Sequence, residues 1–203
     1  DQQMSREDAI RSFGLDPTKK TILIVGGSLG ARTINNCVLN GLDLIKESGV
    51  QFIWQTGKFY ISEAQATVGK AENYPMLHTT DFITDMAAAY SAADLVISRA
   101  GAGSISEFCL LGKPVILVPS PNVAEDHQTK NALALVSKDA ALYIKDSEAS
   151  EKLLKTAVET VQQPDTLKKL STNIAKLAFR DSANTIAAEV WKLALKYREE
   201  HEH

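Results

Sequence analysis

The apolar residues of this chain form two patterns, short continuous runs and longer stretches with helical spacing. Six of the runs have the length and the β-branched content of buried strands. They span residues 21–26, 51–56, 76–80, 94–98, 113–119 and 140–145. The intervening stretches predict helices near residues 5–14, 31–47, 58–68, 85–93, 105–111 and 128–137. This alternation predicts an α/β fold, a parallel sheet of about six strands with helices on both faces.

Beyond about residue 147 the pattern is helical throughout. Three apolar stripes follow one another, and Pro164 ends the first. Their members are Leu153, Leu154, Ala157, Val158 and Val161; Leu167, Leu170, Ile174 and Leu177; and Ile186, Val190, Leu193, Ala194 and Tyr197. We expect these helices to pack on the sheet or on one another, as the tail of a single domain that spans residues 1–203; a partner surface is the other interpretation of the stripes.

Composition and charge narrow the class of protein. Of the 203 residues, 44% are hydrophobic and 23% are charged, which is ordinary for a globular domain with a sizeable core. The formal net charge of −3 provides no basic field for nucleic acid. No apolar run in the sequence approaches the roughly 18 residues of a membrane-spanning helix. Cys37 and Cys109 lie far apart in apolar helical contexts, so we interpret them as reduced core residues of a cytoplasmic protein.

Three glycine-rich or polar turns follow predicted strands, at residues 26–31 (GGSLGA), 99–106 and 119–131. Open α/β sheets bind ligands at the carboxyl ends of their strands. The first turn lacks the GxGxxG spacing, and no acid follows Gln55 at the end of the second strand, which disfavours a nicotinamide cofactor. In the second turn, the glycines either serve only the turn or bring backbone N–H groups close to a phosphate. Three such turns, with Glu107 nearby, predict a nucleotide site.

Four segments of the chain resemble one family. GGSLGAR, DFITDMAAAYSAADLVISRAGAGSISE, GKPVILVP and EDHQTKNA are similar, in order and spacing, to the C-terminal half of the MurG family. The similarity runs from about residue 20 to the end of the chain. This family has the GT-B architecture of two Rossmann-like domains, and it transfers N-acetylglucosamine from UDP-GlcNAc to undecaprenyl-pyrophosphoryl-MurNAc-pentapeptide (lipid I), forming lipid II.

The resemblance covers only the domain that binds the donor. Nothing in the sequence resembles the family's N-terminal domain, which supplies the acceptor site and the membrane-facing surface. The chain opens on Asp1 rather than Met, so we expect it to be a piece of a longer protein. The resemblance implies that the whole protein is cytoplasmic and peripheral on the inner face of the plasma membrane.

The resemblance assigns two segments to the diphosphate of the donor. The serine of GGSLGA meets the phosphates, and the turn before the predicted helix wraps them with backbone amides. The residues concerned are Gly27, Ser28, Ala102, Gly103, Ser104, Ile105 and Ser106. In each case a structural role is the alternative, since Ser28 is also placed to cap the following helix.

The resemblance assigns the remaining parts of the donor to five residues. The backbone of Ile83 reads the uracil edge, and Phe82 lines the same pocket. Glu107 accepts hydrogen bonds from both ribose hydroxyls, or alternatively its charge favours the start of its own helix. Gln128 holds the sugar hydroxyls with help from Asn131, the alternative being a solvated loop residue.

Several charged residues near these segments have two interpretations. Arg99 either neutralises phosphate charge or pairs with a nearby acid. His127 is interpreted as a sugar-edge or structural residue, because the family places its catalytic base elsewhere. His78, inside a short strand, is interpreted as structural. Asp85, Asp94 and Asp126 do not form a metal cluster, and the family needs no metal to hold the diphosphate.

The resemblance implies an inverting displacement in which the lipid I hydroxyl attacks the anomeric carbon as UDP leaves. No catalytic residue is expected in this chain, because the base comes from the other half. UDP-GlcNAc is a substrate, and no cofactor is implied. Two alternatives remain: a natural half-enzyme, like the soluble subunit of the two-chain eukaryotic transferase that acts on dolichol-linked GlcNAc, and a nucleotide-binding module or nicotinamide enzyme.

Overall fold

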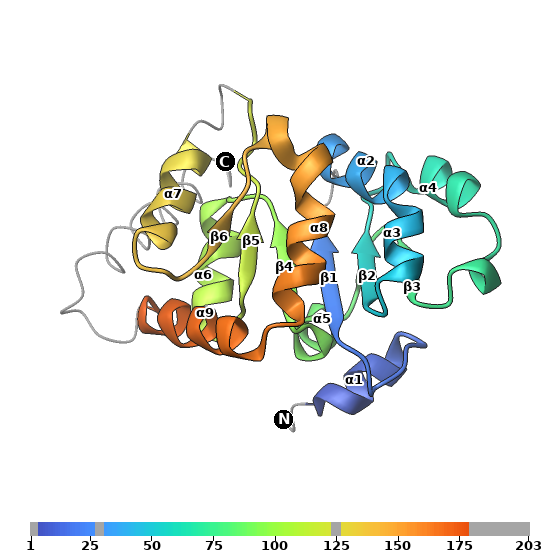
Figure 1. The fold of residues 1–203 in the computed structure, drawn as a ribbon, viewed down its shortest axis with the longest axis horizontal. Helices are drawn as coiled ribbons and strands as arrows, with labels where there is room; N and C mark the ends of the chain where they lie inside the picture. The colour runs from blue at the N-terminus through green and yellow to red at the C-terminus, as the bar shows by residue number, and fades with distance from the viewer. Residues whose placement is uncertain (1–3, 27–30, 123–126, 179–203) are drawn as a thin grey trace.

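Six strands form one parallel sheet in the order β3-β2-β1-β4-β5-β6, as Figure 1 shows. The computed structural model describes residues 4–26, 31–122 and 127–178. The strands are β1 (Thr21–Val25), β2 (Gln51–Gln55), β3 (Leu77–Thr80), β4 (Leu95–Ser98), β5 (Val115–Leu117) and β6 (Leu142–Tyr143). In the register of the central strands, Ile22 of β1 pairs with Phe52 on one side and with Leu95 on the other. The predicted α/β fold with a six-stranded parallel sheet is confirmed.

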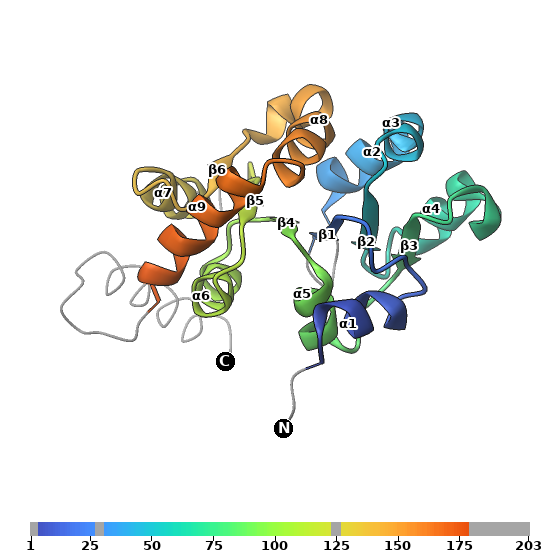
Figure 2. The same ribbon diagram turned by 60° about the horizontal axis from the view of Figure 1, so that its bottom comes forward.

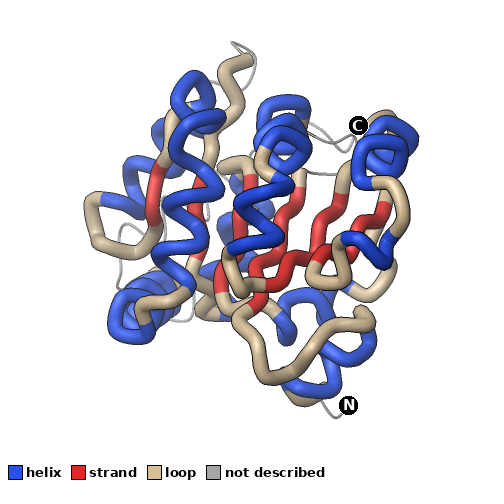
Figure 3. Tube along the Cα trace, turned by 45° about the vertical axis from the view of Figure 1, so that its right-hand side comes forward, coloured by secondary structure: helices blue, strands red, loops and turns tan. Residues whose placement is uncertain are grey.

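Helices cover both faces of the sheet. They are α1 (Arg6–Ser12), α2 (Arg32–Asn40), α3 (Leu42–Glu47), α4 (Ile61–Val68), α5 (Met86–Ala92), α6 (Ala102–Leu111), α7 (His127–Val136), α8 (Ala149–Val161) and α9 (Pro164–Lys176), with short 3-10 turns η1 (Ala71–Asn73) and η3 (Asp146–Glu148). In Figure 2, α2, α3 and α8 lie above the sheet and α1, α5 and α6 below it. Figure 3 shows the strands enclosed between the two layers of helices.

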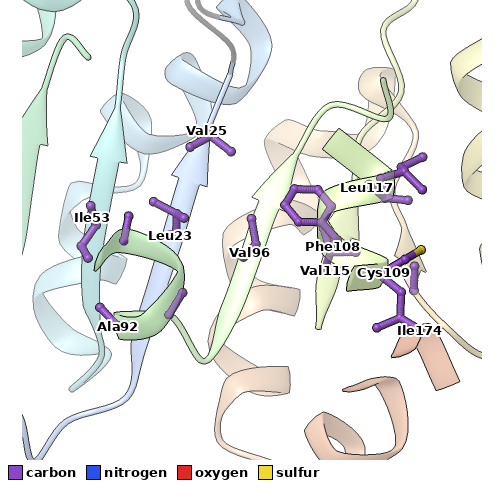
Figure 4. Packing of buried hydrophobic residues seen from close by; sticks show 14 of the residues in the cluster. Leu23, Val25, Ile53, Ala92, Val96, Phe108, Cys109, Val115, Leu117 and Ile174 are labelled. Atoms are coloured by element: carbon purple, nitrogen blue, oxygen red, sulfur yellow. The ribbon is translucent and has the colours of Figure 1, made fainter. Parts of the chain in front are cut away.

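The alternation of side chains along each strand divides the core in two. Leu23 and Val25 of β1 pack with α1, α5, α6, α7 and α9, and Figure 4 shows part of this cluster around Phe108. Ile22 and Ile24 pack with α2, α3, α4 and α8 on the other face. Because both faces are covered, every residue of β1 is buried, which explains its continuous apolar run.

Three predicted helices were wrong in their bounds, and one of them, α4, begins at Ile61 rather than at residue 58. The stretch 31–47 forms two helices that meet at Gly41; a Cβ there would collide with Leu154 of α8 and lie 2.8 Å from the carbonyl oxygen of Cys37, so only glycine fits. Helix α6 begins at Ala102 rather than at residue 105. The first two C-terminal stripes form α8 and α9, whereas the third lies outside the described residues.

The lower edge of the sheet is held by one carboxylate. Asp94, just before β4, forms an ion pair with Arg6 of α1 at 2.7 Å and accepts a hydrogen bond from the backbone N–H of Thr21 at 2.9 Å. These two contacts of Asp94 join α1, β1 and β4. Both cysteines are buried and free, as predicted, and burial raises the pKa of Cys37 to about 11 and that of Cys109 to about 12. Among the described residues, no helix is long and apolar enough to cross a membrane.

Candidate functional site

The sheet has a topological switch point between β1 and β4. The chain leaves β1 toward β2 and enters α2 on one face, whereas it leaves β4 toward β5 and enters α6 on the other face. The loops after the two strands therefore diverge and leave a crevice at their carboxyl ends. A cavity of about 200 Å³ lies there; its lining includes Gly26 after β1, Gln55 at the end of β2, and Arg99, Gly101 and Ser104 after β4.

Helix α6 directs its N-terminus into this crevice. Gly101 is the N-cap residue, and the N–H of Ile105 donates to its carbonyl oxygen at 3.0 Å, closing the first helical turn. The N–H groups of Ala102, Gly103 and Ser104 precede that bond and have no partner within the helix. They also lie at the positive end of the helix dipole, so this turn is suited to an anion. The N–H of Ile105, which the family resemblance assigned to the phosphates, is instead used by the helix itself.

The two glycines of this turn have backbone conformations that other residues can also adopt. Gly101 has a φ of −66°, and Gly103 is helical, so neither adopts the left-handed conformation that favours glycine. A Cβ built at either position would meet no atom within 4 Å in the described part of the molecule. The turn therefore does not use the φ freedom of glycine at either position. Because the two glycines lack side chains, they leave space beside the N–H groups that have no partner within the helix.

Gln128 and Asn131 form hydrogen bonds to the loops after β4 and β5, which border the crevice. Gln128 lies in α7, is only 6% exposed, and accepts two hydrogen bonds at Oε1, from the N–H of Ala100 at 3.1 Å and of Ser120 at 2.9 Å. Asn131, one turn later, donates from Nδ2 to the carbonyl oxygen of Ala100 at 3.2 Å. The alternative that Gln128 is a solvated loop residue is wrong. Its amide oxygen is already occupied, so in the described part of the chain only its NH₂ group remains for a ligand.

Arg99 is neutralised by an acid. Its guanidinium contacts Asp146 of η3 at 2.5 Å and donates to the carbonyl oxygens of Val118 and Pro119, both at 3.2 Å. Asp146 in turn accepts a hydrogen bond from the hydroxyl of Thr33 in α2 at 3.0 Å. Of the two interpretations of Arg99, pairing with an acid is the one observed. Arg99 thus joins the loops after β4, β5 and β6, although its stem still lines the cavity.

The loop before α5 forms a second hollow beside the first. A groove of about 340 Å³ lies between α1 and this loop, and Phe13, His78, Phe82 and Ile83 contribute to its lining. Phe82 is 55% exposed, whereas the side chain of Ile83 is only 3% exposed. The backbone N–H of Ile83 donates to Oε1 of Gln55 at 2.9 Å, so a ligand that uses this N–H must displace Gln55.

His78 has a structural environment, as predicted. Its ring packs edge-on against Phe13 with 5.2 Å between the ring centroids. Burial lowers the pKa of His78, so the neutral imidazole is favoured at this position. The contact fixes α1 against β3 at the margin of the groove.

Glu107 lies in the second turn of α6, because the helix starts at Ala102. The hypothesis that its charge favours the helix start is therefore wrong, since the dipole acts within the first turn. Its carboxylate is exposed and accepts a hydrogen bond at Oε2 from the hydroxyl of Tyr90 in α5 at 3.0 Å. Ser106, by contrast, is buried and donates to the carbonyl oxygen of Ala102 at 3.0 Å, so its hydroxyl is used within the helix.

The remaining expectations concern Gly27, Ser28, His127 and a metal site. Gly27 and Ser28 lie outside the described residues. His127 is the first residue of α7, adjacent to Gln128. Within the described ranges, no group of three or more histidine, cysteine, aspartate or glutamate side chains is arranged to hold a metal ion.

Five residues of the cavity lie outside the three predicted turns: Val25, Gln55, Met86, Tyr90 and Ser98. Gln55 ends β2 at the same edge of the sheet as the three turns. Its place at the end of a predicted strand could therefore have identified it as a residue of the site. Met86 and Tyr90 are one helical turn apart in α5, on the face that looks toward α6. The alanine-rich sequence around Met86 and Tyr90 does not indicate which face of this helix lines the site.

Comparison with known proteins shows clear relatives. Residues 21–186 match the glycosyltransferase family 28 C-terminal domain. The chain is 80% identical over 198 residues to the UDP-N-acetylglucosamine–N-acetylmuramyl-(pentapeptide) pyrophosphoryl-undecaprenol N-acetylglucosamine transferase of Phocaeicola vulgatus, covering 98% of this chain and 53% of that protein. It is 68% identical over 194 residues to the protein of the same name from Bacteroides fragilis, covering 95% and 51%.

A solved structure agrees with these relatives. The crystal structure of Acinetobacter baumannii MurG is similar with a TM-score of 0.70 and 29% identity, covering 94% of this chain and 53% of that one. The chain therefore spans about half the length of the relatives that it matches.

Proposed function

Since this chain belongs to the glycosyltransferase family 28 C-terminal domain family, we propose that it is the donor-binding half of an N-acetylglucosaminyltransferase. The whole protein would transfer GlcNAc from UDP-GlcNAc to undecaprenyl-pyrophosphoryl-MurNAc-pentapeptide, the lipid I to lipid II step of peptidoglycan synthesis. Relatives that carry the name of this activity are up to 80% identical over nearly the whole chain, which supports the assignment.

One structural observation carries the proposal. Gly101 lines the cavity at the switch point of the sheet, and Gly103 is the second residue of the helix that starts there; a side chain at either position would meet nothing in the described molecule. Glycine in a helix destabilises it by roughly 0.5–1 kcal/mol relative to alanine. Gly103 therefore gives the helix no stability, and it leaves open space beside three N–H groups; a diphosphate fits that space and charge.

We assign the parts of the donor to residues in and around this turn. The diphosphate meets the N–H groups of Ala102, Gly103 and Ser104. The ribose hydroxyls meet the exposed carboxylate of Glu107, and the uracil enters the groove beside Phe82 and Ile83. The GlcNAc ring lies toward Gln128, whose NH₂ group is the available donor.

The proposed reaction is a direct displacement with inversion. The acceptor hydroxyl attacks the anomeric carbon, the bond from that carbon to the diphosphate oxygen breaks, and UDP leaves. The N–H groups at the start of α6 stabilise the charge that develops on the leaving phosphate. The acceptor site, the base that takes the acceptor proton and the membrane contact belong to the other half, so we propose a cytoplasmic, peripheral enzyme at the inner face of the plasma membrane.

Calorimetry with the 203-residue chain tests this proposal. UDP and UDP-GlcNAc should bind, uridine should bind much more weakly because it lacks the diphosphate, and NAD should not bind. Tighter binding of NAD than of UDP would overturn the assignment in favour of a nicotinamide enzyme. Equal affinity for uridine and UDP would instead show that α6 does not hold the diphosphate.

A further inference from the structure

In the described part of the chain, the side chain of Tyr90 in α5 contacts the exposed carboxylate of Glu107 in α6. The phenol oxygen of Tyr90 lies 3.0 Å from Oε2 of Glu107 and donates the hydrogen bond. Burial, together with the charge of Glu107, raises the pKa of Tyr90, so its hydroxyl stays protonated and acts as a donor to the carboxylate. Glu107 has no other hydrogen bond or ion pair in the described part of the chain.

The ring of Tyr90 is fixed by its own packing. It lies edge-on against the fully buried Phe108, with ring centroids 6.0 Å apart at an interplanar angle of 83°. Tyr90 also lines the cavity at the switch point, beside Ser104 of α6. Its hydroxyl is therefore held at one place, whereas an exposed glutamate alone would sample many rotamers.

We propose that Tyr90 is a positioning residue for the ribose of the donor nucleotide. By holding Oε2 of Glu107, Tyr90, which itself lines the cavity, sets the carboxylate in one orientation. Oε1 and the second lone pair of Oε2 then remain for two neighbouring hydroxyls. This inference rests on the proposed function, because it gives Glu107 a ribose to bind.

The variant Tyr90→Phe tests the proposal, since it removes only the hydroxyl and keeps the ring against Phe108. Calorimetry on the 203-residue chain would compare UDP with 2′,3′-dideoxy-UDP. Tyr90→Phe should weaken UDP by about 3–10-fold, through the lost ordering of Glu107, and should leave the affinity for the dideoxy nucleotide unchanged. In a Glu107→Gln background the same change should have no further effect on UDP.

The matched control is Tyr143→Phe, which removes a hydroxyl in β6, away from the cavity. It should change neither affinity. Equal weakening of both nucleotides by Tyr90→Phe would show a general packing role and overturn the positioning role. So would an unchanged UDP affinity in Tyr90→Phe. If the wild-type chain binds neither nucleotide, the proposed function itself fails. If the wild type prefers UDP to the dideoxy nucleotide but Tyr90→Phe does so equally, only the role of Tyr90 fails.

Discussion

Replacement of Gly103 by alanine should have opposite effects on stability and on ligand binding. Gly103 is the second residue of α6 and has helical backbone geometry. Alanine fits that geometry, and its Cβ would meet no atom within 4 Å in the described molecule. In the unliganded protein, the change therefore removes only the extra freedom of glycine in the unfolded chain.

The size of both effects can be estimated. A Gly→Ala change at a compatible position stabilises a protein by about 0.4–1 kcal/mol. For a chain of this length that corresponds to a rise in Tm of roughly 1–4 °C. In the complex, the new methyl group would stand between the phosphate oxygens and the N–H groups of the first turn. Loss of one hydrogen bond to a charged group is worth about 1.5–3 kcal/mol, so UDP affinity should fall by about 10–100-fold.

The assay pairs thermal unfolding of the free chain with calorimetric titration of UDP. Gly112→Ala is the matched control, because it makes the same chemical change at the other end of the same helix. Gly112 has a φ of 62°, in the left-handed region, so alanine there should destabilise the chain by about 1–2 kcal/mol. UDP affinity should be unchanged in this control, since Gly112 lies at the opposite end of α6 from the cavity.

Two results would refute the reasoning. If Gly103→Ala lowers the Tm of the free chain, the space around this glycine is needed by the fold rather than by a ligand. If Gly103→Ala raises the Tm and UDP binds as tightly as before, the space is not occupied by the diphosphate. Either outcome would remove the observation on which the proposed function depends.

Four further predictions follow from the site. Glu107→Gln should weaken UDP at least about tenfold and abolish the preference for UDP over 2′,3′-dideoxy-UDP; an undiminished preference would exclude the ribose role. Arg99→Met should lower the free energy of unfolding in denaturant by about 1–3 kcal/mol, because Asp146 loses its cation. If Arg99 instead bound the phosphates, this variant would lower only the affinity for UDP. The pKa of His78 is lowered in the folded state, so the unfolded chain binds more protons and the free energy of unfolding should fall as the pH drops through about 6.5. Urea titrations at about pH 8 and about pH 5 measure this fall, which should be smaller in His78→Gln than in the wild type. Finally, the isolated chain should show no GlcNAc transfer to a lipid I analogue in a radiolabel assay, and turnover free of contamination would place the base in this chain.

The sheet could be predicted from sequence because its strands are buried on both faces. A parallel strand such as β1 is a continuous apolar run, and such runs are distinctive. The helix boundaries were harder, because they depend on distant contacts. Gly41 is visible in the sequence as a residue that weakens a helix, but the close approach of Leu154, far along the chain, which leaves no room for a Cβ there, is not. No local pattern contains that information.

The candidate site was predicted in outline, since turns at the carboxyl edge of a parallel sheet converge. The partners of each polar side chain were not predictable. Arg99 meets Asp146 only because β5 and β6 bring η3 beside the loop after β4. Likewise, the amide of Gln128 is occupied by backbone N–H groups whose position depends on two strands. Composition indicates which residues are polar, whereas the fold decides which of them remain available.

The position of β1 in the middle of the sheet has a consequence for folding. Thr21 at its start contacts Gln51 only 30 residues away, but its contact with Asp94 closes a loop of 73 residues. The longer loop costs about 0.8 kcal/mol more in closure entropy. We therefore expect β1, β2 and β3 to associate first and the unit of β4, β5 and β6 to dock last. The cavity takes its lining from both units, so it comes into existence only at that docking step. A ligand bound there should then slow unfolding without accelerating folding.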